Sequence, residues 1–131
     1  MQRIAAGAPP APLLRRAALA AAAAGAEIAL RIVGALESKK LNGRYRRQNR
    51  PTNVLSFPYG GGSGDVVLCH PVIAREAREQ GKTLRAHYAH LVVHGVLHLR
   101  GLDHATRGEA ARMERRETAM LRRLGFGDPY Q

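Results

Sequence analysis

Residues 94–104 read HGVLHLRGLDH, and this stretch decides how the rest of the chain is interpreted. His94 and His98 are four residues apart, so on a helix their side chains project from one face with Cβ atoms about 5–6 Å apart. Gly101 can adopt the backbone conformation that ends a helix and turns the chain, which would bring His104 back toward the other two histidines. The pattern therefore predicts a metal site whose ligands are His94, His98 and His104, with one zinc ion per chain.

The spacing of these histidines equals that of the metallopeptidase signature H-E-x-x-H-x-x-G-x-x-H. In that signature the second position holds the glutamate that acts as general base, but Gly95 stands there in this chain. A peptidase would therefore lack its base, although it stays as an alternative. Three neutral ligands leave the ion its full double charge and an open fourth position, which is typical of catalytic zinc sites.

Two neighbouring residues are candidates for a supporting role behind the metal ligands. His90 lies one turn before His94 and could either orient a ligand or simply pack. Asp103 could hydrogen-bond near the metal or cap the turn before His104. His70 and His87 are expected to be ordinary surface or packing residues, and Cys69 a buried strand residue.

Charge and length limit the class of protein. The 131 residues fit one domain spanning residues 1–131. Against 10 acidic residues stand 21 Lys and Arg, giving a net charge of +11, which favours nucleic acid over an anionic membrane surface as partner. The alternative is that the charge is only compositional, because Arg outnumbers Lys. A single cysteine excludes an internal disulfide and suits a reducing cytoplasm.

No membrane segment is expected. The alanine-rich stretch within residues 13–30 is too short for the roughly 20 apolar residues that a bilayer span requires, and Glu27 interrupts it. Because alanine is the best helix former, we expect a surface helix that ends near Gly25.

The hydrophobic pattern predicts an α+β fold. Alternating apolar residues predict strands, and residues 60–64 are expected to form a flexible hairpin loop, since no phosphate-binding Lys-Ser/Thr pair follows them. A final helix is expected to expose its charged residues, Glu117 among them, and to bury Met113 and Leu121. Expected strands are 26–33, 54–57 and 65–69; expected helices are 13–24, 35–45, 73–80, 83–100 and 107–124.

Several blocks of the sequence together resemble the YbeY family of bacterial endoribonucleases. The family signature H-G-x-L-H-L-x-G-Y-D-H is matched by residues 94–104, with Leu102 in place of the aromatic residue. Residues 1–25 depart from the family, because its apolar first strand is weak in residues 2–6. Further matching blocks are Leu41-Asn42, Tyr45-Arg46, residues 51–58, Gly64-Asp65, Ala89-His90 and residues 124–126.

The resemblance implies a single α+β domain, in which helices pack a small mixed β-sheet and a cleft holds zinc on three histidines. It implies a single-strand-specific endoribonuclease that acts in rRNA maturation, at the 3′ end of small-subunit rRNA, and in ribosome quality control. Arg46 would be the catalytic arginine facing the metal, and Arg44, Arg47 and Arg50 would add RNA contacts.

The expected partners are single-stranded rRNA and the ribosome or its small subunit, in the cytoplasm, with no small-molecule cofactor. A rival interpretation is a non-catalytic ribosome-assembly factor whose zinc is structural. The attacking oxygen, either a zinc-activated water or the RNA 2′-hydroxyl, is left open.

Overall fold

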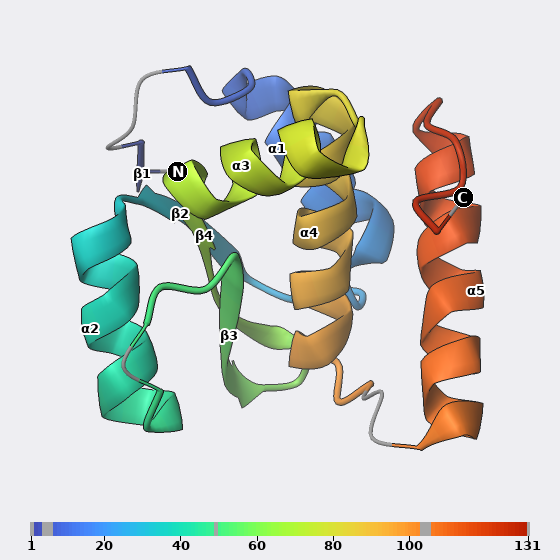
Figure 1. Cartoon of the computed structure of the whole chain (residues 1–131). Coiled ribbons are helices and arrows are strands. Elements are labelled where there is room, and N and C mark those ends of the chain that lie inside the picture. Colours follow the sequence, from blue (N-terminus) through green and yellow to red (C-terminus); the bar gives the residue numbers. More distant parts are fainter. Residues whose placement is uncertain (1, 4–6, 49, 103–105, 131) are drawn as a thin grey trace.

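The computed structural model describes residues 2–3, 7–48, 50–102 and 106–130, together forming an α+β fold. A four-stranded sheet lies between helices on its two faces (Figure 1). The strands are β1 (Gln2–Arg3), β2 (Ile28–Val33), β3 (Val54–Gly60) and β4 (Ser63–Cys69). The helices are α1 (Ala11–Ala21), α2 (Ala35–Arg46), α3 (His70–Gln80), α4 (Leu84–Leu99) and α5 (Arg107–Arg123).

The sheet is mixed, as expected, with strand order β1-β2-β4-β3. Strand β2 runs parallel to both β1 and β4, whereas β3 runs antiparallel to β4 at the edge of the sheet. The weak N-terminal segment contributes only the two-residue strand β1. Residues 4–6 of that segment lie outside the described residues.

Alternation along the central strands divides the core between the two faces of the sheet. Leu30 and Ile32 of β2 and Val66 and Leu68 of β4 point into the larger cluster, which α1, α4 and α5 complete. On the other face a smaller cluster under α2 contains Val33, Leu55, Val67, Cys69 and Val72. Cys69 is a buried free thiol, in agreement with the sequence. Helix α4 therefore lies against one face of the sheet and α2 against the other (Figure 1).

The glycine-rich segment is a hairpin turn, but a tighter one than the sequence predicts. Strands β3 and β4 continue into it, so that Gly60 pairs with Ser63 and only two residues form the turn. Both turn residues, Gly61 and Gly62, have positive φ angles, which two-residue hairpin turns favour because they match the twist of the strands.

Helix α1 is more than a surface helix. Its inner face packs against α4 and is fully buried at Leu14, Ala17 and Ala21. In the part of the chain that the structure describes, no helix is long and apolar enough to cross a membrane.

Candidate metal centre

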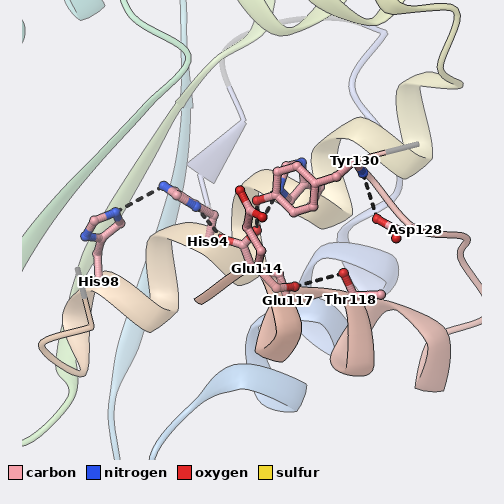
Figure 2. A network of polar contacts seen from close by, with 8 residues as sticks. His94, His98, Glu114, Glu117, Thr118, Asp128 and Tyr130 are labelled. Carbon is pink, nitrogen blue, oxygen red and sulfur yellow. Dashed lines mark hydrogen bonds and ion pairs between the residues drawn. The ribbon is translucent and has the colours of Figure 1, made fainter. Parts of the chain in front are cut away.

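Helix α4 carries the first two predicted metal ligands. The hydroxyl of Thr83 accepts a hydrogen bond from the backbone N–H of Ala86, which caps the start of the helix as predicted. His94 and His98 follow near its C-terminal end, and their Nε2 atoms lie 3.0 Å apart (Figure 2). After the helix, Gly101 has a φ angle of 85°, the left-handed conformation expected there.

The distance between the two histidines fits a shared ion. Two imidazole nitrogens bound to a tetrahedral zinc at about 2.0–2.1 Å lie about 3.3 Å from each other. The observed 3.0 Å is close to that value, and both side chains are only partly buried, so an ion could reach them. The third predicted ligand, His104, and the neighbouring Asp103 lie outside the described residues.

A buried carboxylate supports His94 from behind. Glu117 of α5 is fully buried, and its Oε1 accepts a hydrogen bond from Nδ1 of His94 at 2.5 Å. Its Oε2 accepts from Nε2 of His90 at 2.9 Å and from the hydroxyl of Tyr130. Because the carboxylate only accepts, the proton lies on His94 Nδ1, which leaves Nε2 of the neutral ring as a lone-pair donor toward the metal position.

The protonation states of this network follow from its hydrogen bonds. Burial by itself raises the pKa of the Glu117 carboxyl, but hydrogen bonds from His90, His94 and Tyr130 outweigh burial and hold that pKa at about 2. Burial, together with the hydrogen bond to Glu117, raises the pKa of Tyr130. The phenol therefore stays protonated and donates, while Glu117 stays ionised at neutral pH.

The prediction that Glu117 lies on an exposed face is wrong. The signal for its burial was present in the sequence, because Glu117 falls four residues after Met113 and four before Leu121. On a helix these three side chains share one face, and both apolar neighbours are buried as predicted. A carboxylate within an apolar stripe needs buried partners, and here His90, His94 and Tyr130 provide them.

His90, His94 and Glu117 also form a second possible metal-binding group. One ligand atom from each of them lies within 4.8 Å of the others. His90 is thus a partner of Glu117 and not merely a packing residue. The structure brings together two overlapping donor sets, His94 with His98 and His94 with His90 and Glu117, and they share His94.

The surroundings of Gly95 count against the peptidase interpretation. A Cβ atom at this position would lie 2.8 Å from Cγ1 of Val66 and 3.2 Å from Oγ of Ser56. Position 95 therefore faces the sheet rather than the metal, and Ser56 donates a hydrogen bond to the Gly95 carbonyl across this contact at 2.9 Å. A general-base glutamate cannot occupy this place in the fold.

The predicted arginine cluster lies at and after the C-terminal end of α2. Arg44, Arg47 and Arg50 are exposed; the side chain of Arg46 is outside the described part of the structure. Two buried polar side chains of α2 hold the loop that follows. Ser38 exchanges two hydrogen bonds of 3.0 Å with the backbone of Thr52, and Asn42 donates to the Arg50 carbonyl at 2.8 Å.

Another polar cluster was not predicted from the sequence. The Nε2 atom of His87 donates to Oε1 of Glu76 at 2.9 Å, and Asn53 donates to the same carboxylate oxygen at 3.1 Å. Burial lowers the pKa of His87, and this effect outweighs the opposing hydrogen bond to Glu76, so the ring is neutral at neutral pH. His70, in contrast, is a packing residue as expected, with its Nδ1 at 2.6 Å from the Tyr88 hydroxyl.

Comparison with known proteins places this site in a family. Residues 13–125 match the family described as Endoribonuclease YbeY. The chain belongs to the YbeY family. It is 56% identical to the endoribonuclease YbeY of Bordetella pertussis over 112 residues, which cover 82% of this chain and 71% of that protein. It is 52% identical to the endoribonuclease YbeY of Aromatoleum aromaticum over 125 residues, 93% of this chain and 81% of that protein.

A solved structure supports the same fold. The solution structure of TM1509 from Thermotoga maritima superposes with a TM-score of 0.58, covering 100% of this chain and 99% of that protein. At 24% sequence identity this likeness concerns the fold alone. The small mixed sheet packed by helices is therefore shared with a chain of distant sequence.

Proposed function

We propose that this chain is a zinc-dependent endoribonuclease that cuts single-stranded RNA during rRNA maturation, at the 3′ end of small-subunit rRNA, and in ribosome quality control. The observation that carries the proposal is the pair of Nε2 atoms of His94 and His98, 3.0 Å apart, in a chain of the YbeY family. Family membership makes the chain an endoribonuclease, a hydrolase acting on RNA. Zinc as the metal, the ribosome as partner and the cytoplasm as location belong to the proposal.

In this proposal His94, His98 and His104 hold the ion. When bound, zinc supplies positive charge that polarises a phosphoryl oxygen of the scissile phosphodiester. Glu117 keeps the proton of His94 on Nδ1, so that Nε2 is available to the ion. The burial of Glu117 helps to hold this proton, because the hydrogen bonds that the histidines donate to a carboxylate are stronger when the carboxylate is shielded from water.

Arg46 is proposed to grip the scissile phosphate. Its planar guanidinium can donate two parallel hydrogen bonds to phosphate oxygens and stabilise the charge that develops there. The exposed Arg44, Arg47 and Arg50 would bind neighbouring phosphates of the same strand. Ser38 and Asn42 support this role, since they hold the arginine-bearing loop against α2.

Single-turnover cleavage of a defined single-stranded RNA by the purified protein tests the proposal. Arg46→Lys keeps the positive charge but cannot donate two parallel hydrogen bonds to one phosphate, so we expect the rate of RNA cleavage to fall by about two to three orders of magnitude. Arg47→Lys is the matched control and should retain most of the activity. Equal, small losses in both variants would remove Arg46 from the catalytic machinery.

The rival functions make different predictions in the same assay. A non-catalytic assembly factor would leave the RNA intact, even though it bound zinc. A peptidase would instead hydrolyse an unstructured casein substrate. Analysis of the product ends distinguishes attack by water from attack by the 2′-hydroxyl, because only the latter gives a cyclic phosphate.

A further inference from the structure

A cavity of about 360 Å³ lies beside the metal centre, on the side away from His98 along α4. His94 lines it at one end, and Asn53, Glu76, Lys82 and His87 line it further along the helix. His87 precedes His94 by seven residues, about 10 Å of helix rise. The volume is at the lower end for small-molecule pockets.

The wall of this cavity presents an acceptor with room for a further hydrogen bond. Oε1 of Glu76 is occupied by His87 at 2.9 Å and Asn53 at 3.1 Å. Among the described residues, Oε2 has only a long contact of 3.4 Å with the same amide of Asn53. The Glu76 side chain is 24% exposed, whereas that of His87 is only 4% exposed. A buried histidine and an amide thus hold the carboxylate in place while one of its oxygens stays accessible.

Two further features belong to the residues that line this cavity. The Nδ1 atoms of His87 and His90 are buried and have no hydrogen-bond partner among the described residues. Tyr130 also borders the cavity, and the residue is 47% exposed, although its hydroxyl is tied to Glu117 (Figure 2). Proteins stack unpaired bases on aromatic side chains that solvent can reach.

The chemistry of Glu76 selects the kind of base. A carboxylate accepts hydrogen bonds from the exocyclic amino group of adenine, cytosine or guanine. Uracil has no amino group, and its Watson–Crick edge places carbonyl oxygens on both sides of its single N–H, where they would repel the carboxylate. Lys82 also lines this cavity, and its positive charge reduces the repulsion between the Glu76 carboxylate and the phosphates of an RNA strand.

We propose that this cavity is a nucleobase subsite next to the scissile phosphate, in which Glu76, held by His87 and Asn53, selects a base with an exocyclic amino group over uracil. This inference rests on the proposed function, because it assigns a base preference to the same RNA-cleaving site. Glu76 is a binding residue for the base and takes no part in the proton transfers of cleavage.

Sequencing of the product ends from an RNA library with a randomised unpaired segment tests the subsite. For the wild-type protein we expect uridine to be depleted by about tenfold or more at one position flanking the cut. In Glu76→Gln that depletion should largely disappear, while zinc content stays unchanged. Glu79→Gln is the control, since Glu79 lies on the same helix with its side chain 65% exposed and does not line the cavity.

Titration with AMP, CMP, GMP and UMP separates failure of the subsite from failure of the proposed function. Weaker binding of UMP than of the other three, lost in Glu76→Gln, supports the subsite even if no RNA is cut. Cleavage with equal use of all four bases, or a uridine depletion that Glu76→Gln leaves intact, overturns it. Should Glu76→Gln fail to fold, Lys82→Met, at the same cavity, must weaken binding of all four nucleotides.

Discussion

At the scale of single residues, Glu117 is the group on which the metal centre depends. Burial of a carboxylate costs free energy unless hydrogen-bond donors surround it. Glu117 accepts hydrogen bonds from three donors, which belong to α4 and the C-terminal segment. The same bonds fix the ring orientation and tautomer of His94. Glu117 therefore couples the packing of α5 to the geometry of the metal ligand.

Glu117→Gln tests that coupling. The amide offers one acceptor oxygen in place of two, so at least one of the three donors loses its partner. Loss of such an outer partner typically weakens metal binding by 10–100-fold, and we expect a zinc affinity reduced by about that factor in competition with a chelating dye. Glu114→Gln, at an exposed position one turn earlier on α5, should bind zinc like the wild type. An unchanged affinity in Glu117→Gln would limit Glu117 to a packing role.

The two overlapping donor sets are separated by a pair of histidine variants. If His94, His98 and His104 hold the ion, His98→Ala should lose zinc during dialysis, because only two of its protein ligands remain. His90→Ala should keep its zinc with at most a modest loss of affinity. Elemental analysis measures the zinc content of both variants. Zinc retained in His98→Ala but lost in His90→Ala would assign the ion to His90, His94 and Glu117.

At the scale of elements, most of the fold could be predicted from the sequence. Alternation in β2 and the glycine after α4 predicted the strand and the helix end correctly, because each signal is local. The spacing of Met113, Glu117 and Leu121 did indicate that they share a face, but the partners of Glu117 and the Glu76–His87 pair could not be predicted in the same way. Each of these contacts joins two different helices, α4 with α5 and α3 with α4, and a helical period alone does not show which neighbour will cover a face.

Helix α2 ends in an unusual way. Arg47 follows its last residue with a φ angle of 57°, the left-handed conformation in which glycine is normally found. Among the residues that the structure describes, it is the one non-glycine residue with positive φ. An arginine there turns the chain at a conformational cost and keeps an exposed cation at the end of α2.

Replacing Arg47 by glycine should relieve that cost. We expect Arg47→Gly to raise the free energy of unfolding by about 1 kcal/mol, measured by urea denaturation. Arg44→Gly removes the same charge from within the helix, where glycine costs roughly 0.5–1 kcal/mol, so it should shift stability in the opposite direction. Equal changes in the two variants would mean that the removed charge, and not the backbone, determines the effect.

At the scale of the whole molecule, the net charge of +11 is the property that a substrate meets first. The sequence alone could not show where that charge matters, because arginines are spread over the chain. In the fold, the exposed cluster of Arg44, Arg47 and Arg50 lies at and after the C-terminal end of α2, while α5 carries its own exposed arginines on the other side of the molecule (Figure 1). The position of these two groups gives a direct test of which one binds RNA.

Binding of single-stranded RNA should weaken steeply as salt rises, because each bound phosphate releases condensed counterions. On a single strand, each neutralised phosphate adds about 0.7 to the steepness of log affinity plotted against log salt. The double variant Arg44→Gln/Arg50→Gln should therefore make the slope shallower by about 1.4. Arg112→Gln/Arg116→Gln removes two exposed charges from α5 and lowers the net charge equally, but it should leave the slope nearly unchanged. If both double variants reduce the slope alike, RNA responds to the total charge and the cluster at the C-terminal end of α2 is not a specific binding surface.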